Sequence, residues 1–245
     1  MTATEVKLKY EILKPKENAL PVIIVAAGSS SRMQGVNKQL LEIGGIPVLI
    51  RTLKAFENSD SISRIILVVR DEDIFFIQML CEKYSVNKIS DIVCGGENRQ
   101  QSVLKGFSRL SSDETAVLIH DGARPFVSKK IIEDVASRLE EYPAVICGVK
   151  VTDTIKQISD GGTVVKTLNR EELIRVQTPQ GVRIAEYLSA AEKIKDSLGS
   201  FTDDGSIMEN AGHTVAFVEG SYKNIKITTP EDIALSQGFT EEEDL

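Results

Sequence analysis

The residues best suited to chemistry are cations and small residues that follow an apolar run near the start of the sequence. Residues 22–26 have the pattern of a buried strand and lead into Ala27 and Gly28, with Arg32 and Lys38 a few positions later. Small side chains let backbone N–H groups approach a ligand closely, and the two cations supply fixed positive charge. A strand that ends in such a turn favours a polyphosphate ligand. An ordinary solvent loop is the alternative interpretation.

This turn matches neither of the two common phosphate-binding motifs. The sequence contains no G-x-x-x-x-G-K-[ST] motif and no G-x-G-x-x-G motif. Because the P-loop and the dinucleotide fingerprint depend on those glycines, their absence argues against a P-loop NTPase and against a nicotinamide-dependent oxidoreductase. The turn by itself does not say which phosphate compound binds.

Glycines and charged residues also follow, or lie within, three other predicted strands. They are Gly95, Gly96, Arg99 and Ser102 after residues 89–94, Asp121 after residues 116–120, and Lys226 within residues 224–227. In a doubly wound sheet, ligands bind at the carboxyl ends of the strands. We therefore expect these residues to meet the turn at Gly28 in one crevice.

Asp121 is the acidic residue of this group and the predicted metal ligand. Mg²⁺ prefers one or two carboxylates, with phosphate oxygens and water completing its coordination. Asp121 directly follows an apolar strand and stands among phosphate-type loops, so we interpret it as a magnesium ligand. The alternative is that Asp121 pairs with Arg124 or begins a turn. His120 and His213 have no supporting pattern of metal ligands, and we predict structural roles for both.

The composition narrows the class of protein. The 245 residues are 42% hydrophobic and 27% charged, which is typical of a globular protein with one large domain. A formal net charge of −7 argues against sequence-independent binding of nucleic acid. Cys81, Cys94 and Cys147 fit neither a zinc site nor a disulfide framework, so we predict buried, reduced thiols. The charged N-terminus lacks the pattern of a signal peptide, and these features together favour the cytoplasm.

Predicted strands and helices alternate from residue 20 onward. This alternation predicts the α/β fold class, with a doubly wound, mostly parallel, Rossmann-like sheet. The predicted strands are residues 22–26, 65–69, 89–94, 116–120, 144–149, 214–219 and 224–227. The predicted helices begin at or just after residues 47, 71, 98, 128, 183, 203 and 230.

A change of rhythm after the fifth strand predicts an arm. Short alternating segments lie on either side of Asp160-Gly161-Gly162, which is a hairpin signal. We expect this hairpin to project from the domain. The chain is therefore predicted to have an N-terminal extension at residues 1–19, one domain at residues 20–238 with the arm at about 150–178, and an acidic tail at residues 239–245.

Together these loops resemble the 2-C-methyl-D-erythritol 4-phosphate cytidylyltransferases of the methylerythritol-phosphate pathway of isoprenoid synthesis. The segments that carry the resemblance are residues 26–33 with Lys38 and Gln39, and residues 95–103, 120–125, 151–154, 177–180, 202–204 and 224–228. They occur in the order of the family and cover the chain from about residue 20 to residue 237. Each segment is a weak signal alone, but the ordered set is specific.

The resemblance implies a fold of the nucleotidyltransferase type and transfer of the cytidylyl group of CTP to 2-C-methyl-D-erythritol 4-phosphate. It implies catalytic roles for Arg32, Lys38 and Lys226, and a Mg²⁺ site at Asp121. It implies nucleotide binding by Ala26, Ala27, Gly28, Gly96, Arg99 and Ser102, and binding of the polyol phosphate by Thr154, Arg170 and Thr178. It also places Arg170 on an arm that reaches into a neighbouring subunit, which implies a homodimer with arm exchange.

Two alternatives share this nucleotide site. A ribitol-5-phosphate cytidylyltransferase would use the same loops, although residues 121–124 and 152–178 favour methylerythritol phosphate. A non-catalytic nucleotide-binding module on the same fold is the second alternative. The presence of Lys38, Asp121 and Lys226 together argues against that module.

Overall fold

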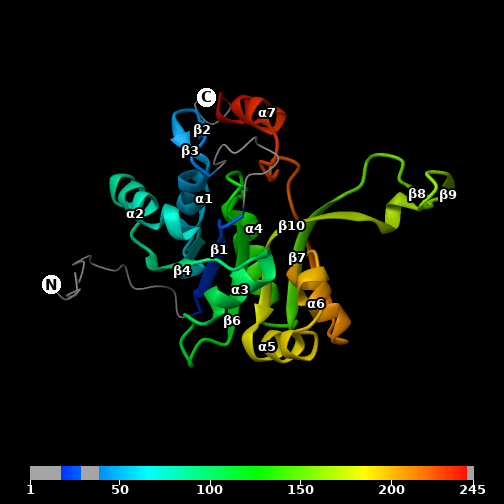
Figure 1. The fold of residues 1–245 in the computed structure, drawn as a ribbon, viewed down its shortest axis with the longest axis horizontal. Helices are drawn as coiled ribbons and strands as arrows, with labels where there is room; N and C mark the ends of the chain where they lie inside the picture. The colour runs from blue at the N-terminus through cyan, green and yellow to red at the C-terminus, as the bar shows by residue number, and fades with distance from the viewer. Residues whose placement is uncertain (1–17, 29–38, 242–245) are drawn as a thin grey trace.

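The structure is a computed structural model that describes residues 18–28 and 39–241, without the side chain of Glu241 (Figure 1). Arg32 and Lys38 lie outside the described residues, as do residues 1–17 of the predicted extension and residues 242–245 of the predicted tail. The division into extension, domain and tail therefore stays a prediction. Within the described ranges, no helix is long and apolar enough to cross a membrane.

A sheet of seven strands forms the centre of the fold, in the order β11-β7-β10-β6-β1-β4-β5. The strands are β1 (Leu20–Val25), β4 (Ile62–Val69), β5 (Ile89–Cys94), β6 (Ala116–Asp121), β7 (Ala144–Lys150), β10 (Ile174–Arg183) and β11 (Val215–Glu219). Neighbouring strands run parallel, except that β10 is antiparallel to both β6 and β7. The predicted α/β class and the mostly parallel sheet are confirmed.

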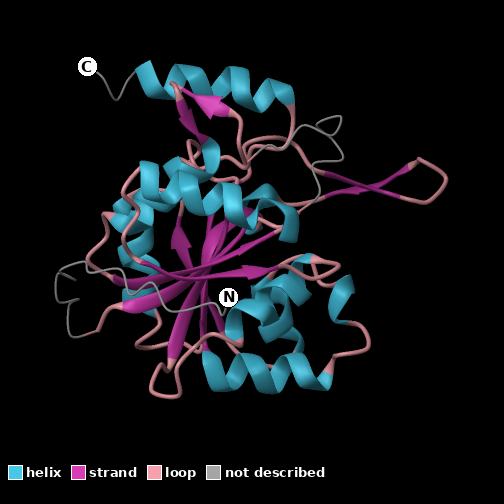
Figure 2. Cartoon of the chain, turned by 60° about the vertical axis from the view of Figure 1, so that its left-hand side comes forward, coloured by secondary structure: helices cyan, strands magenta, loops and turns pink. Residues whose placement is uncertain are grey.

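Helices cover both faces of this sheet, as Figure 2 shows. One face carries α1 (Val48–Glu57), α2 (Ile74–Lys83) and α4 (Lys129–Arg138), and the other carries α3 (Arg99–Phe107), α5 (Ile184–Lys193) and α6 (Asp204–Asn210). Side chains on β1 alternate between the two cores, because Val22 and Ile24 pack on the first face and Ile23 packs on the second. All three are fully buried, which explains the continuous apolar run in the sequence.

The main element that the sequence analysis missed is β10. Its ten residues include glutamines and Pro179, so they lack the pattern of a continuous buried strand. Its pairing with β7 is interrupted by a bulge between Gln177 and Gln180, which accommodates the proline that has no N–H to donate. β10 lies between β6 and β7 and so places an antiparallel strand near the centre of the sheet.

Other boundaries also differ from the prediction. Residues 224–227 are a loop, so the predicted strand there is wrong. β2 (Glu42–Ile43) and β3 (Ile46–Pro47) form a small hairpin that was not predicted, and its turn glycines Gly44 and Gly45 have φ angles of 56° and 72°. α7 (Pro230–Glu241) extends beyond the predicted end at residue 237 and packs against β2. The described residues also form the short 3₁₀ helices η2 (Asp71–Asp73), η3 (Arg170–Glu172) and η4 (Leu198–Ser200).

The three cysteines are free thiols, but their positions differ. Cys81 and Cys147 are buried as predicted, and burial raises the pKa of each thiol to about 12. Cys94 is exposed, which corrects the prediction of a buried thiol. Cys94 is the last residue of β5, which lies at the edge of the sheet, so its side chain has fewer neighbours.

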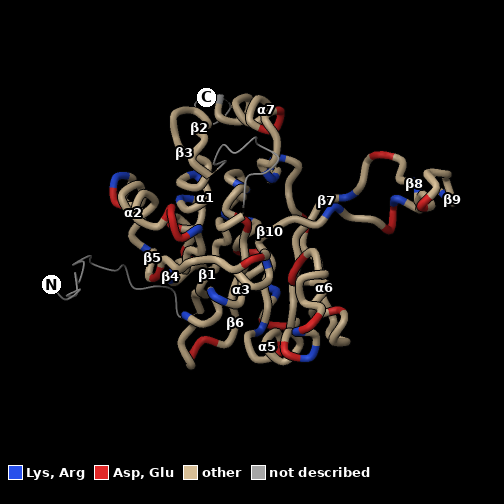
Figure 3. Tube along the Cα trace, viewed as in Figure 1, with Lys and Arg blue, Asp and Glu red and all other residues tan. Residues whose placement is uncertain are grey.

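The predicted arm consists of β8 (Lys156–Ile158) and β9 (Val164–Thr167), which pair with each other and project away from the sheet in Figure 1. Lysines, arginines and acidic residues alternate along it in Figure 3. Its apolar side chains Ile158, Val164 and Val165 are 64%, 61% and 58% exposed. The arm therefore carries apolar surface that the described part of this chain does not cover.

Gly106 lies on the buried face of α3, where the helix approaches β1. A Cβ added there would lie 2.5 Å from Cγ2 of Ile23. Alanine gains about 1 kcal/mol of helix propensity over glycine, but overpacking a core costs about 1–3 kcal/mol. We therefore expect Gly106→Ala to lower the free energy of unfolding by about 1 kcal/mol in urea denaturation.

Gly238→Ala in α7 is the matched control, because nothing lies within 4 Å of a Cβ added at Gly238. Helix propensity then acts alone, so this variant should gain up to about 1 kcal/mol. Equal effects of the two substitutions would contradict the close packing of α3 on β1.

Candidate active site

A cavity with two adjoining parts opens at the carboxyl ends of the parallel strands. The larger part has a volume of about 460 Å³, and its lining includes Ala27, Gly28, Gly96 and Ser102. The smaller part has a volume of about 290 Å³, and its lining includes Thr178, Gln180, Thr202 and Asp203. Arg99, Asp121 and Lys226 line both parts and therefore stand at their junction.

Asp121 is a buried carboxylate at the end of β6 that faces three cations. Its Oδ2 lies 2.9 Å from Nζ of Lys226 and 3.6 Å from Nε of Arg124, and its Oδ1 lies 3.2 Å from Nε of Arg99. Burial alone would raise the pKa of Asp121, but the positive charges of Arg99, Lys226 and Arg124 hold it well below its usual range. The carboxylate is therefore ionised at every physiological pH.

A chain of hydrogen bonds fixes the backbone of Asp121 behind this cluster. The N–H of Asp121 donates to Oγ1 of Thr178 at 3.0 Å, and the same oxygen lies 3.0 Å from Nδ1 of His120. Nε2 of His120 lies 3.2 Å from the carbonyl oxygen of Arg124, so this nitrogen carries the proton. Nδ1 then accepts the hydroxyl proton of Thr178. Burial lowers the pKa of His120 to about 3, so the ring is neutral and structural, as predicted.

Arg99, the first residue of α3, bridges two carboxylates. Its Nη2 lies 2.8 Å from Oδ2 of Asp204, opposite the contact to Asp121. Asp204 is fully buried, and its Oδ1 accepts the hydroxyl proton of Tyr187 at 2.9 Å. The flanking acids hold the pKa of Arg99 above its usual value although burial opposes this. Arg99 is thus a permanent cation in a fixed place.

The loop before Arg99 is shaped by its own hydrogen bonds. The hydroxyl of Ser102 accepts the N–H of Gly96 at 3.0 Å and donates to the carbonyl oxygen of Asn98 at 2.9 Å. The side chain of Asn98 caps α3 by accepting the N–H of Gln101 at 2.9 Å. A Cβ on Gly96 would lie 2.4 Å from Cβ of Gln101, so this tight turn requires glycine.

Lys226 lies on a loop that is held from two sides. On one side, Nδ2 of Asn224 donates to the carbonyl oxygen of Thr178 at 2.9 Å. On the other side, Nη1 of Arg124 donates to the carbonyl oxygen of Asn224 at 2.8 Å, and the N–H of Ile227 donates to that of Ala123 at 2.8 Å. These hydrogen bonds hold the segment in place of the strand pairing that was predicted, and they orient Lys226 toward Asp121.

The structure brings most of the described candidates to one place and leaves two elsewhere. Ala27, Gly28, Gly96, Arg99, Ser102, Asp121, Lys226 and Thr178 line the cavity. Ala26 lies beneath the cavity. A Cβ added at Gly122 would lie 3.0 Å from Cβ of Ala26. Thr154 and Arg170 lie toward the arm and are exposed, and Nη1 of Arg170 donates to the carbonyl oxygen of Thr152 at 2.9 Å. Arg32 and Lys38 fall outside the described residues.

Sequence reasoning gave no role to Asp204, Tyr187, Gln180 or Asn224. Asp204 stood in one of the resembling segments, Thr202-Asp203-Asp204, and that is the only signal that could have identified it. Gln180 accepts the N–H groups of Asp204 and Gly205 at 2.9 and 3.0 Å, and so it ties β10 to α6. The sequence pattern around Tyr187 predicts only an apolar residue on the buried side of a helix, so it indicates no role in the site.

Asp121 is the residue predicted to hold a divalent cation, and its surroundings can be compared with what Mg²⁺ requires. Among the described residues, no three histidine, cysteine or acidic side chains gather as a metal site. Mg²⁺ can take a single carboxylate and complete its shell with phosphate oxygens and water. Asp121 lines the cavity, and its Oδ1 accepts one hydrogen bond, from Arg99, so the residue fits such a role. The surrounding cations favour a metal that arrives with a polyphosphate over a bare ion.

Comparisons with known proteins match this chain to one family. Residues 20–242 match the family model described as IspD, 2-C-methyl-D-erythritol 4-phosphate cytidylyltransferase. The protein of that name from Clostridium novyi (strain NT) is 45% identical over 222 residues, which cover 89% of this chain and 95% of that protein. The crystal structure of 4-diphosphocytidyl-2C-methyl-D-erythritol synthase from Anaerococcus prevotii DSM 20548 gives a TM-score of 0.82 at 34% identity, over 91% of this chain and 96% of that one. The 2-C-methyl-D-erythritol 4-phosphate cytidylyltransferase of Thermus thermophilus gives a TM-score of 0.74 at 27% identity, over 91% and 99%.

Thr178→Val tests the chain of hydrogen bonds behind Asp121. Valine has a similar shape but leaves the buried N–H of Asp121 and Nδ1 of His120 without partners, and each loss costs about 1–3 kcal/mol. We expect the free energy of unfolding to fall by about 2 kcal/mol in urea denaturation. Thr178→Ser keeps the hydroxyl and should lose about 1 kcal/mol for its missing methyl group. A valine variant as stable as the serine variant would contradict these bonds.

Proposed function

This chain belongs to the 2-C-methyl-D-erythritol 4-phosphate cytidylyltransferase family, and we propose that the cavity at Arg99, Asp121 and Lys226 is where its reaction takes place. The enzyme transfers the cytidylyl group of CTP to 2-C-methyl-D-erythritol 4-phosphate and releases pyrophosphate, in isoprenoid precursor synthesis. The observation that carries the proposed location is the set of three cations around one ionised carboxylate at the strand ends. The alternative acceptor, ribitol 5-phosphate, is not favoured by the family.

The chemistry requires positioning and charge neutralisation more than acid–base catalysis. The nucleophile is a phosphate monoester whose second pKa is about 6, so it is largely ionised at neutral pH without a base. Both substrates are anions, and their approach is opposed by charge. Catalysis then depends on cations placed where negative charge gathers on the reacting phosphates. The neutral, buried His120 is consistent with a site that needs no general base.

Lys226 is the described residue best placed for that work. Its Nζ lies 2.9 Å from Oδ2 of Asp121, and its side chain is 35% exposed toward the cavity. The ion pair holds the ammonium group at the junction of the two parts before any substrate binds. In this proposal Lys226 faces the reacting phosphorus, and Lys38 and Arg32 complete the site from the segment outside the described residues.

Most of the other proposed nucleotide contacts line the larger part of the cavity, and Ala26 lies beneath it. The proposed CTP site is formed by Ala26, Ala27 and Gly28 at the triphosphate, and by Gly96, Arg99 and Ser102 at the cytosine and its ribose. Asp121 would hold Mg²⁺, which supplies further positive charge to the triphosphate when bound. Free buried thiols such as Cys81 fit an enzyme of the reducing cytoplasm.

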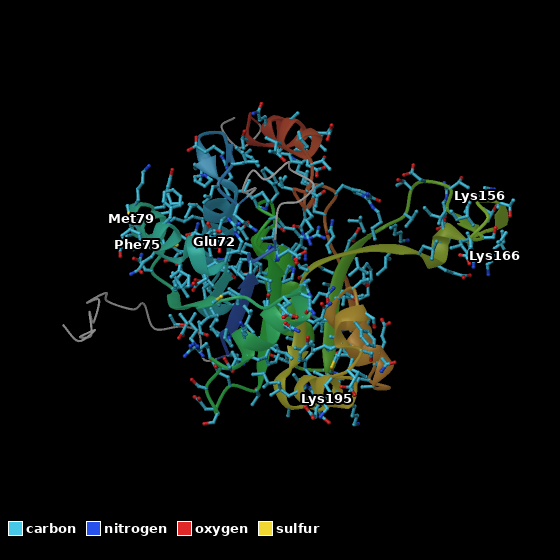
Figure 4. All side chains as sticks on the ribbon, in the orientation of Figure 1. Glu72, Phe75, Met79, Lys156, Lys166 and Lys195 are labelled. Carbon is cyan, nitrogen blue, oxygen red and sulfur yellow. The ribbon has the colours of Figure 1, made fainter. Side chains whose placement is uncertain are left out.

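The polyol phosphate site is proposed to include Thr154, Arg170 and Thr178. Thr178 lines the smaller part of the cavity, whereas Arg170 lies in η3, just after β9 of the arm. Lys156 and Lys166, on the two strands of the arm, lie away from the body in Figure 4. An isolated two-stranded hairpin is marginally stable in water. The exposed apolar side chains of the arm support its packing on a second copy of the chain, and we therefore propose a homodimer with arm exchange.

Lys226→Ala should lower kcat by about 10²–10³, because one contact to the charge of the transition state is lost. The measurement is pyrophosphate release from CTP with 2-C-methyl-D-erythritol 4-phosphate and Mg²⁺. Lys130→Ala, which removes an exposed lysine of α4, is the matched control and should leave kcat unchanged. Near-normal turnover of the Lys226 variant would contradict the proposed site. Turnover with ribitol 5-phosphate at the same efficiency would contradict the acceptor.

Arg170→Ala should raise KM for the polyol phosphate and leave KM for CTP unchanged, while Lys166→Ala on the arm should change neither. The expected rise in KM for the polyol phosphate is about tenfold, because one hydrogen-bonded charge is lost. Co-expression of the Arg170→Ala and Lys226→Ala chains tests arm exchange in the same assay. Mixed dimers would contain one site with both residues intact, so activity should partly return. No recovery from dimers that demonstrably mix would contradict an arm that serves its neighbour.

A further inference from the structure

Arg99 lies between two carboxylates whose surroundings differ. Besides Arg99, two other cations contact Asp121, namely Lys226 at 2.9 Å and Arg124 at 3.6 Å. Asp204 is fully buried, and within the described ranges Arg99 is its single ion-pair partner. The contact of Arg99 to Asp204 is also shorter, at 2.8 Å against 3.2 Å for Asp121.

This difference decides which contact can open. Separating Arg99 from Asp204 would leave a buried carboxylate without a compensating charge, which is strongly destabilising. Separating Arg99 from Asp121 leaves Lys226 and Arg124 on that carboxylate. The guanidinium can therefore exchange Asp121 for an incoming acceptor while it stays anchored on Asp204.

Asp204 is itself held rigidly. The hydroxyl of Tyr187 donates a hydrogen bond to Oδ1 of Asp204 at 2.9 Å. The backbone N–H of Asp204 donates to Oε1 of Gln180 at 2.9 Å. The ring of Tyr187 is fully buried and stacks on Phe107, with ring centroids 4.7 Å apart. Arg99 begins α3 and Phe107 ends it, so α6 contacts the start of α3 through Asp204 and α5 contacts its end through Tyr187. The position of Arg99 is thus set by the packing of three helices.

One nitrogen of Arg99 is left to serve a ligand. Among the described residues, its Nη1 is buried and has no hydrogen-bond partner. A buried donor without an acceptor is costly, and Arg99 lines both parts of the cavity. We propose that Asp204, held by Tyr187, is a positioning residue that fixes Arg99 to bind the nucleotide. This inference rests on the proposed function, which places CTP in the larger part of the cavity.

Tyr187→Phe and Asp204→Asn test the proposal, with kcat and KM for CTP measured by pyrophosphate release and the Kd of CTP measured by calorimetry. Tyr187→Phe keeps the stacked ring and removes one hydrogen bond, so the Kd and KM of CTP should rise about fivefold with little change in kcat. Asp204→Asn should raise them more, by about tenfold or beyond. Tyr142→Phe, at a half-buried tyrosine packed elsewhere on the core, is the control and should change neither.

The decisive measurement repeats Tyr187→Phe in an Arg99→Lys background. Lysine keeps a positive charge for Asp204 but lacks the forked guanidinium that can contact two partners at once. Arg99→Lys alone should therefore raise the Kd of CTP by about tenfold. In that background Tyr187→Phe should change CTP binding less than about twofold, although it still lowers the stability measured in urea. An undiminished effect on CTP there would overturn the positioning role and leave the proposed function intact. Unchanged CTP binding by Arg99→Lys would instead overturn the nucleotide role of Arg99.

Discussion

The ionised carboxylate of Asp121, buried at the end of β6, is the constraint on which the rest of the site depends. Burial opposes its charge, so the fold must surround it with cations. Those cations come from the start of α3, from the loop after β6 and from the loop before α7. One buried charge thereby brings together segments that are about a hundred positions apart in the chain. Within this cluster three cations face the two carboxylates of Asp121 and Asp204, so one positive charge is in excess and can serve anionic substrates.

The antiparallel strand β10 makes this compensation possible. If β10 paired regularly with β7 along its whole length, the backbone groups of Thr178 would form hydrogen bonds to that neighbouring strand. The bulge between Gln177 and Gln180 releases it, so its hydroxyl accepts the N–H of Asp121 and its carbonyl oxygen accepts the amide of Asn224. The loop of Lys226 is then tied to the end of β6 through β10. An irregularity in one strand therefore sets the distance between the lysine and the carboxylate.

Local signals in the sequence were sufficient for most of the fold and for half of the site. The apolar runs of the parallel strands and the helix starts near residues 98 and 128 depend on neighbouring residues, and the structure has them close to where they were predicted. β10 mixes polar residues with a proline, and the loop of Lys226 has no period, so neither had a readable pattern. The pairing of Arg99 with Asp204 joins positions 105 apart and depends on how α6 packs against α5 and the sheet. The sequence could identify a cation at a strand end, but it could not identify the acid that holds it.

Three described cations of the site, Arg99, Lys226 and Arg124, are paired within the protein, so those that bind substrate must exchange partners. Lys226 and Arg99 are shared with Asp121, and each can turn toward a substrate without leaving that buried carboxylate uncompensated, because the other cations remain. Arg124 cannot turn in the same way, since its Nη1 is fixed on the carbonyl oxygen of Asn224. It therefore stays with Asp121 throughout. The three cations have different tasks: one anchors the carboxylate, and two are available to the substrates at a small cost in reorganisation.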